Sequence, residues 1–424
     1  MFEVTLYFIL VVSPLVLISQ WYKRSLISGF MTLSMSFFGV ILFNLLGSIS
    51  VLNDSSLFSL GYFLSLMLII VMFYVYSILL MRYRRKLVIQ WKDKIRVSDN
   101  EPVVPLLLFL WGISFSILFV YVQHNGMPAL FEYDLIDAND VYALRAEKST
   151  NLSEGSHWYR FGFNRIPTFV LIYIYVLHRT SGTKMSKTLL VLNLPLVVAF
   201  SSFSMHKSSI IYLVLNVLLV RVALRDIKLN LYQGLKYLTL SFISIVGMLR
   251  LYLMDRPFGD VLLLAPNYLY NRVFVAYTKA HALIIKIIPS QHDYFYGIAF
   301  ANPGHIFSYE PVNLSQLLGY WAFGQLNNYS QPSFSQGYAN FGYIGLILIV
   351  IIMFVQISLI QLIFKQLPGN PLFLSLYIYI LPSMLGYAST SIMNILDEQY
   401  IILFCITVVL YYTIKIFRNR LSLA

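Results

Sequence analysis

Long apolar runs separated by short polar breaks make up most of the chain. Eleven of these runs approach the length that a helix needs to cross a bilayer core, which is roughly 20 residues. They cover residues 4–20, 26–52, 57–81, 102–123, 165–178, 188–205, 208–224, 236–254, 338–364, 371–390 and 399–416. Because lipid offers no partner to an unpaired backbone group, we expect each run to be an α-helix. The pattern predicts an all-α polytopic membrane protein in which residues 1–424 form one transmembrane domain.

Two of the predicted connections are long, at residues 124–164 and 255–337, and both fall on the same side of the membrane. The second contains the stretch NYLYNRVFVAYTKAHALIIKII, in which Arg272, Lys279 and Lys286 recur every seven residues. Seven residues advance a helix by about 700°, so the three cations drift by only about 20° per step along one face. We therefore predict an amphipathic helix at the membrane interface, with Lys286 as its weakest candidate ligand.

Two glycines at the beginning of the predicted span 338–364 indicate close packing. Gly342 and Gly345 lie three residues apart, so they share one face of a regular helix. Such a face allows a neighbouring helix to approach closely, although ordinary helix packing needs nothing more specific than this.

Composition and charge support the membrane interpretation. Hydrophobic residues make up 58% of the chain and charged residues only 11%, against about 25% charged residues in soluble domains. With the N-terminus outside, the predicted cytoplasmic segments hold 20 of the 30 Lys and Arg but only 4 of the 18 Asp and Glu, which gives +16 there and −4 elsewhere. Lys and Arg are typically enriched on the cytoplasmic side, so we predict an N-out/C-in topology. The net charge of +12 therefore reflects topology and does not indicate a nucleic-acid partner.

The sequence lacks the short motifs that mark common cofactor sites. It has no G-x-x-x-x-G-K-[ST] and no G-x-G-x-x-G, so neither ATP nor a dinucleotide is expected. It has no H-E-x-x-H and a single cysteine, Cys405, so we predict no zinc site. The two long predicted loops lie outside the cytoplasm, where no nucleotide sugar is available. A transferase that acts there therefore needs a donor that carries its own leaving group. A lipid-linked diphosphate meets that need without any cofactor.

Several cations fall where the predicted outer ends of spans meet the long outer loops. We predict that some of them bind the donor diphosphate, because arginine keeps its charge and its planar group matches phosphate oxygens. The predicted diphosphate ligands are Lys207, Arg250, Arg256, Arg272 and Lys279, and further candidates are Arg160, Arg165 and His206. Each has an alternative explanation, since interfacial cations often extend toward head groups or pair with an acid. Arg256, for example, has Asp255 and Asp260 close in sequence.

The outer loops also carry candidates for proton transfer and for carbohydrate contact. Glu310, in HIFSYEPVN, is a candidate general base for a sugar hydroxyl, and Arg272 and Lys207 are the cations expected to act at the reacting diphosphate. His281 and His305 are further candidates, although a lone histidine is more often a hydrogen-bonded structural residue. No histidine pair has metal-ligand spacing, so no metal is predicted. The aromatic residues predicted to stack on sugars are Trp158, Tyr159, Tyr268, Tyr270 and Trp321.

Two short segments resemble a known family. In SQGYANFGYIGLILI, residues 335–349, a polar residue precedes Tyr338 and an N-F-G-x-x-G turn opens a span, while SFSMHKSSIIYLVL places Lys207 in a short outer turn before another span. With the span layout and the large late loop, these segments resemble the Wzy-type O-antigen polymerases, which are related to the O-antigen ligases. The resemblance implies a GT-C-like glycosyltransferase in the bacterial inner membrane, with its active site facing the periplasm. It assigns the family's basic residues to Lys207, Arg256 and Arg272 and makes Tyr338 a candidate site residue.

The resemblance also implies an activity and a set of partners. The growing glycan would pass from undecaprenyl diphosphate to the terminal sugar of a new lipid-linked repeat unit, as in O-antigen and lipopolysaccharide biosynthesis. The partners are then undecaprenyl-diphosphate-linked glycans, membrane lipids and, as a candidate, a chain-length regulator protein. Three alternatives stay open. A ligase would differ only in its acceptor, a lipid-linked oligosaccharide flippase would need a central cationic cavity, and a solute transporter would need ionisable residues within its spans.

Overall fold

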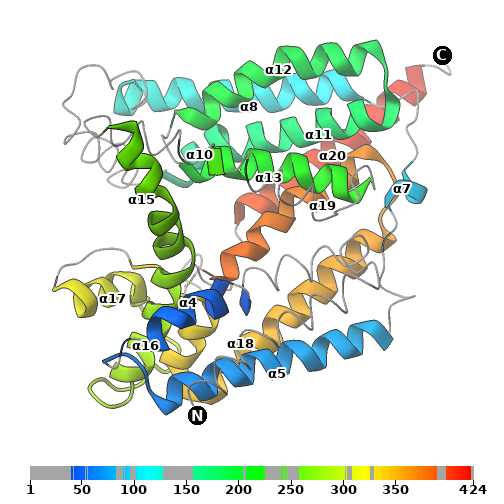
Figure 1. Ribbon diagram of the computed structural model, residues 1–424. Helices are drawn as coiled ribbons and strands as arrows, with labels where there is room; N and C mark the ends of the chain where they lie inside the picture. The colour runs from blue at the N-terminus through cyan, green and yellow to red at the C-terminus, as the bar shows by residue number, and fades with distance from the viewer. Residues whose placement is uncertain are drawn as a thin grey trace. The chain divides into compact units, whose positions relative to one another are not determined.

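The computed structural model describes residues 40–41, 43–52, 54, 56–82, 89, 91–95, 102–127, 156–203, 207–224, 239, 242–243, 246, 257–300, 302, 308–324, 329–388 and 398–421. In these stretches all regular structure is helical, and none of them contains a strand (Figure 1). The predicted first span 4–20 lies outside the described residues, as do most of the predicted span 236–254 and most of the loop 124–164.

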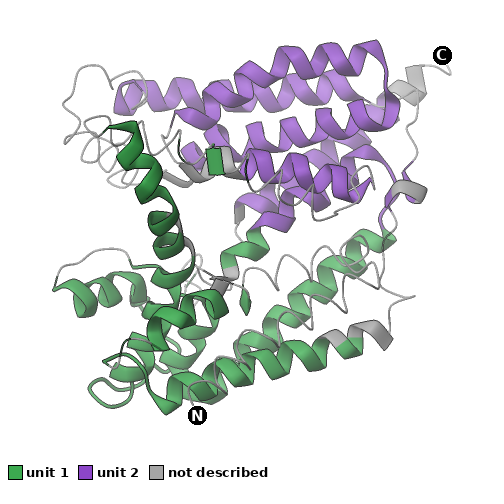
Figure 2. Ribbon diagram, viewed as in Figure 1, with its two compact units in different colours: residues 1–89, 239–366, 383–395 green, residues 90–238, 367–382, 396–424 purple. Residues whose placement is uncertain are grey.

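The chain divides into two compact units, coloured green and purple in Figure 2. Unit 1 comprises residues 1–89, 239–366 and 383–395, and unit 2 comprises residues 90–238, 367–382 and 396–424. The described helices of unit 1 are α4 (Phe43–Leu52), α5 (Leu60–Arg82), α15 (Phe258–Tyr270), η5 (Asn271–Val275), α16 (Ala276–Ile287), α17 (Leu314–Phe323) and α18 (Ser333–Gln366). Those of unit 2 are α7 (Trp91–Lys94), α8 (Val103–Asn125), α10 (Ser156–Arg160), η4 (Phe161–Arg165), α11 (Ile166–Ser181), α12 (Lys184–Ser202), α13 (Lys207–Ala223), α19 (Pro371–Ile380) and α20 (Glu398–Leu421), and the 3₁₀-helix η7 (Leu381–Ala388) crosses the boundary.

Four of the described helices are long and apolar enough to cross a membrane. They are α8, α12, α18 and the Gln399–Phe417 part of α20. Shorter apolar helices cover Leu60–Tyr76, Tyr212–Ala223 and Pro371–Gly386. All of these helices coincide with predicted spans, as expected for a helical membrane protein. The number of eleven spans and the N-out/C-in orientation stay predictions.

The turn between α11 and α12 follows from two residues in the polar break of the sequence. Gly182 ends α11 with φ of 62°, in the left-handed region that glycine adopts without steric cost. Thr183 then caps α12, because its hydroxyl oxygen accepts a hydrogen bond from the Ser186 N–H at 3.2 Å. The turn is therefore tight, and it makes α11 and α12 antiparallel neighbours, as the predicted spans 165–178 and 188–205 require.

In unit 1, α5 and α18 lie side by side and run in the same direction (Figure 1). At one end the Tyr343 hydroxyl donates to the Gly61 carbonyl oxygen at 3.0 Å. Further along both helices, the ring of Tyr76 stacks on Phe354 at 4.0 Å. Residue numbers rise together along the pair, so the helices are parallel, which is the relation that alternating spans predict for 57–81 and 338–364.

In unit 2 the helix directions also follow the predicted alternation. Trp111 of α8 donates to the Asn193 side-chain oxygen of α12 at 2.6 Å, and Phe115 lies 5.1 Å from Phe200, so these two helices are parallel. Helices α19 and α20 are antiparallel, since Tyr379 meets Tyr400 at 5.1 Å while Asn370 bonds Tyr411 at 3.2 Å. These directions are consistent with a polytopic bundle, although they do not show which side is outside.

The helix α18 differs from the predicted span in a way that matters for the site. It begins at Ser333 and is broken at Phe341 (φ −143°, ψ 21°) and Gly342 (φ 63°, ψ −144°). The prediction that Gly342 shares a helical face with Gly345 is therefore wrong, because Gly342 sits in the break. Gly345 does allow a close approach, but from Gly337 of the same helix, whose carbonyl oxygen a Cβ at Gly345 would overlap.

Candidate functional site

A buried histidine joins three helices of unit 1. His281 of α16 is fully buried, with its Nε2 at 2.8 Å from the Ser65 hydroxyl of α5 and its Nδ1 at 2.8 Å from the Ser335 hydroxyl of α18. Ser65 donates its own proton to the Tyr62 carbonyl oxygen at 2.6 Å, so we assign the imidazole proton to Nε2 and let Ser335 donate to Nδ1. Both nitrogens are engaged and neither is exposed, which favours a structural role for this candidate residue.

Burial also fixes the charge state of this histidine. It lowers the pKa of His281 from 6.5 to about 3, because the apolar surroundings disfavour the charged imidazolium. Below pH 6.5 the unfolded chain therefore binds a proton at this histidine that the folded chain does not bind. The contribution of His281 to the free energy of unfolding is thus complete above pH 6.5 and is lost as the pH falls toward 3.

We expect this titration to appear in thermal unfolding of the detergent-solubilised protein. Between pH 7 and pH 5 the unfolding midpoint of the wild type should fall. His281→Gln, which can still bond both serines, should show a smaller fall, whereas His292→Gln, at an exposed site, should keep the wild-type slope. Equal slopes in all three proteins would contradict the assignment of a neutral, buried His281.

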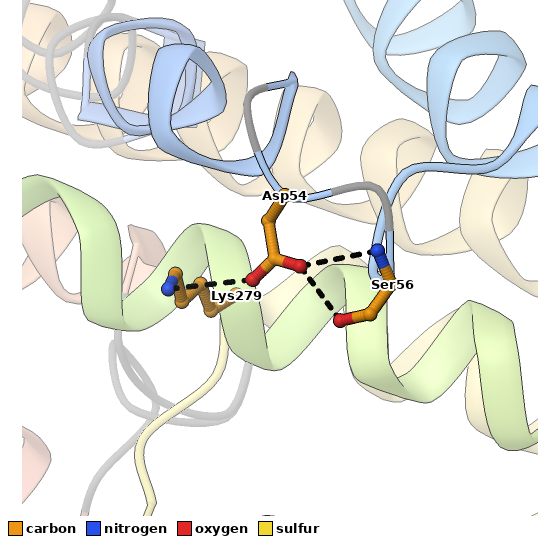
Figure 3. A network of polar contacts seen from close by, with 3 residues as sticks. All are labelled: Asp54, Ser56 and Lys279. Atoms are coloured by element: carbon orange, nitrogen blue, oxygen red, sulfur yellow. Dashed lines mark hydrogen bonds and ion pairs between the residues drawn. The ribbon is translucent and has the colours of Figure 1, made fainter.

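The predicted diphosphate ligand Lys279 is paired with an acid (Figure 3). Its Nζ lies 3.7 Å from Asp54 Oδ2, on the connection between α4 and α5. Asp54 Oδ1 accepts hydrogen bonds from the hydroxyl and the backbone N–H of Ser56, at 2.6 and 3.1 Å. These hydrogen bonds, followed by the charge of Lys279, lower the pKa of Asp54. Lys279 is therefore less available to a substrate anion than its place on the predicted cationic face indicated.

Arg272, the principal predicted ligand, lies on the π-helical segment η5 with an exposed side chain. Gly47 of α4 packs directly on this part of the helix, since a Cβ there would overlap Phe274 and Thr278. A π-helical turn rotates the following side chains relative to a regular helix, and such turns are frequent at functional sites. Burial raises the pKa of the Tyr329 phenol to about 12, and the positive charge of Arg272 acts in the opposite direction. The two side chains therefore lie within electrostatic reach, and the sequence had not singled out Tyr329.

The family-like segment at residues 335–349 forms the kinked part of α18, and it packs against α16 and the chain that follows. Tyr338 is nearly buried, with its hydroxyl 3.5 Å from the Ile288 carbonyl oxygen and its ring facing Tyr294 and Tyr343. Ser335 reaches His281, as described above. The segment and the cation-bearing helix are thus parts of one packed structure, a relation that the sequence alone did not show.

The aromatic residues predicted to contact sugars have different surroundings. In unit 1, Tyr268 is exposed, the Tyr270 hydroxyl donates to the Leu46 carbonyl oxygen at 2.9 Å, and Trp321 lies 5.7 Å from the ring of His292. In unit 2, Trp158 is exposed and meets Phe161 edge-on at 6.1 Å, and Tyr159 packs on Tyr121 at 4.8 Å. Exposure leaves Tyr268 and Trp158 best placed to meet a ligand.

The predicted site cations of unit 2 lie at the ends or beginnings of helices. Arg165 immediately precedes α11, whose Pro167 suits a first turn, as predicted. Its guanidinium donates to the Gln399 side-chain oxygen at 3.2 Å and to the Tyr400 hydroxyl at 2.5 Å, and it lies over the Tyr400 ring at 4.2 Å. Arg160 ends α10 with an exposed side chain, and Lys207 is the first residue of α13.

The predicted site residues are divided between the two units. Unit 1 holds Arg272, Lys279, Glu310, His281 and Tyr338, and unit 2 holds Lys207, Arg160 and Arg165. Glu310 is exposed and follows Tyr309, whose carbonyl oxygen accepts from Asn302 at 2.9 Å. Four predicted residues lie outside the described part of the chain, namely Arg250, Arg256, His206 and His305. Among the described residues no group of three His, Cys, Asp or Glu could hold a metal ion.

No protein-family model, no curated protein and no solved structure matches this chain.

Proposed function

We propose that this protein is a membrane glycosyltransferase that polymerises lipid-diphosphate-linked oligosaccharide repeat units on the outer face of the bacterial inner membrane. The observation that carries the proposal is the packing of the 335–349 segment on α16, the helix that continues directly from η5, on which Arg272 lies. Both pieces were singled out separately, one for its resemblance to the Wzy-type polymerases and one for its cationic face. In unit 1 they meet through His281–Ser335 and Tyr338–Ile288.

The proposed reaction has a simple electron balance. A hydroxyl of the acceptor sugar attacks the anomeric carbon of the donor glycan, and the bond between that carbon and the phosphate oxygen breaks. The electron pair leaves with the lipid diphosphate, whose added negative charge Arg272 stabilises through bidentate hydrogen bonds. The hydroxyl proton passes to the carboxylate of Glu310, an exposed acid of the same unit. Arg250 and Arg256, from the same stretch 239–366 of the chain, are proposed as further diphosphate ligands, and the reaction needs no metal or nucleotide.

A deletion strain tests the proposed function against its alternatives. Loss of a polymerase should leave single lipid-linked repeat units at the outer face, and surface glycan should carry one repeat unit in place of a long-chain distribution. Repeat units stranded on the inner leaflet would indicate a flippase and would contradict the proposal. Long polymer that stays on its lipid carrier would indicate a ligase.

A further inference from the structure

A second feature of unit 1 is a group of aromatic side chains built around the break in α18. The chain after α16 returns to α18, where the Asn340 side-chain oxygen accepts hydrogen bonds from the N–H groups of Gly297 at 2.8 Å and Ala299 at 3.2 Å. Two backbone hydrogen bonds of 3.1 Å add to these, from Phe295 to the Ala339 carbonyl and from Tyr296 to the Asn340 carbonyl. Residues 295–299 are therefore held firmly against the break.

This attachment brings four aromatic residues together, Tyr294, Tyr296, Phe341 and Tyr343, which we call the aromatic platform. The exposed fractions are 72% for Tyr296, 41% for Phe341 and 36% for Tyr343. Tyr294 meets Tyr296 edge-on, with ring centroids 6.4 Å apart, and its hydroxyl would lie 2.9 Å from a Cβ at Gly342. Gly297 borders the ring of Phe341, where a Cβ would be at 3.7 Å. The two glycines thus leave room for the rings of Tyr294 and Phe341.

The backbone of Tyr296 is in an unfavourable conformation. Its φ is 51°, and it is the only non-glycine residue with a positive φ among those that the structure describes. A bulky side chain rarely adopts this region, and residues that do so are concentrated at ligand sites. A tyrosine that only anchors the protein at a lipid interface needs no such fixed orientation, because lipid adapts to the ring. The backbone conformation fixes the direction in which the Tyr296 side chain leaves the chain, which favours a ligand of defined shape.

The geometry points to the aromatic platform as a glycan-binding site in which a sugar ring stacks on Tyr296, with Phe341 and Tyr343 beside it. Sugar rings present an apolar face of C–H groups to an aromatic ring and hydroxyls at their edge to phenols, so the platform offers both kinds of contact. This inference rests on the proposed function, and it identifies the platform as a place where the glycan part of a lipid-linked repeat unit is held. None of these four residues was among the sugar contacts predicted from the sequence.

Binding can be measured separately from polymerisation. The probe is the water-soluble oligosaccharide released from lipid-linked repeat units by mild acid, and its binding is followed by saturation-transfer NMR with the full-length protein in nanodiscs. Tyr296→Ala and Tyr296→Gly should each weaken binding by about tenfold, the equivalent of about 1.4 kcal/mol, whereas Tyr296→Phe should stay close to the wild type. Tyr320→Ala is the matched control, since Tyr320 is an exposed tyrosine of α17 in the same unit, and it should bind as the wild type does.

The variants distinguish the effect of losing the ring from the effect of backbone strain, because glycine adopts the left-handed conformation without strain. If Tyr296→Gly binds like the wild type while Tyr296→Ala does not, the backbone and not the ring is responsible, and the inference is overturned. Wild-type binding in both variants, or no binding by the wild type, overturns it as well. So does a loss of reconstitution into bilayers with unchanged oligosaccharide affinity, which would assign the ring to the lipid interface.

These outcomes are distinct from failure of the proposed function. A wild-type protein that polymerises repeat units, with variants that bind the oligosaccharide normally, would leave the polymerase standing without the platform. If the wild-type protein makes no polymer, and the Tyr296 variants bind the oligosaccharide more weakly than the wild type does, the proposed polymerase activity is overturned and the glycan site remains.

Discussion

Replacing Arg272 by alanine is expected to lower the rate of polymer formation by about two to three orders of magnitude, the usual effect of removing one electrostatic group at the reacting atoms. The exposed guanidinium sits on η5, in the same unit as the family-like segment of α18. Arg272→Lys should be intermediate, because the ammonium keeps the charge but loses the planar pair of donors. Lys279→Ala should have a smaller effect than Arg272→Ala, since Asp54 already neutralises Lys279.

The rates are to be measured as initial polymer formation in proteoliposomes with equal amounts of inserted protein. Lys286→Ala is the matched control, because Lys286 is an exposed cation on α16, which continues from η5, two heptads beyond Arg272. It should polymerise as the wild type does. If Arg272→Ala also retains the wild-type rate, Arg272 is not the diphosphate ligand that we propose.

The second large effect is expected at Gly345. Here a methyl group would overlap the carbonyl oxygen of Gly337, so Gly345→Ala forces apart the two sides of the break in α18. Inserting a group into such a packed contact typically costs about 1–3 kcal/mol, and in this case the overlapping atom is backbone, which cannot turn aside. The variant should unfold at a clearly lower temperature in detergent, and the 335–349 segment should lose its fixed arrangement.

A glycine in open space provides the comparison. Gly112 lies inside α8, and a Cβ there would meet nothing within 4 Å. Gly112→Ala should therefore leave the unfolding temperature unchanged or raise it, because alanine favours the helix by about 1 kcal/mol relative to glycine. Similar losses in both variants would mean that the effect comes from glycine substitution in general and not from the contact between Gly337 and Gly345.

The parts of the fold that the sequence predicted correctly are those set by local chemistry. The spans 165–178 and 188–205 were predicted from run length, and the turn between α11 and α12 lies in the polar break that separates them. The apolar helices follow from the length of the apolar runs. A segment that is surrounded by lipid has no water to bond its backbone N–H and C=O groups, so these groups must bond one another. The break at Gly342 was missed, since N-F-G-x-x-G is compatible with a regular helix until the contact of Gly337 with Gly345 is known.

The contacts that build the candidate site were beyond sequence reasoning because they join distant segments. His281 meets Ser65, 216 residues away, and no periodic pattern marks either one as a partner of the other. Asn340 is part of the family-like motif, but its role depends on the N–H groups of Gly297 and Ala299. These groups lie near Asn340 because the chain after α16 folds back against α18. The exposed, strained Tyr296 was likewise one tyrosine among 32 in the sequence.

Charge was predictable in kind but not in pairing. The seven-residue spacing predicted that Arg272 and Lys279 share one face of a regular helix, but Arg272 lies on the π-helical η5 and Lys279 on α16. Asp54, from the connection between α4 and α5, pairs with Lys279. The sequence shows how many cations and acids each predicted side of the membrane holds. Which cation is paired with an acid depends on the fold, because the acid can come from a distant turn. This difference makes Arg272 the stronger candidate of the two.

The most direct test of the central claim uses purified protein with lipid-diphosphate-linked repeat units in proteoliposomes, with EDTA present and no nucleotide added. The account predicts ladders of glycan polymer on the lipid carrier and release of one lipid diphosphate for each unit joined. An absolute requirement for a metal ion or a nucleotide, or the absence of any polymer from correctly inserted protein, would contradict it.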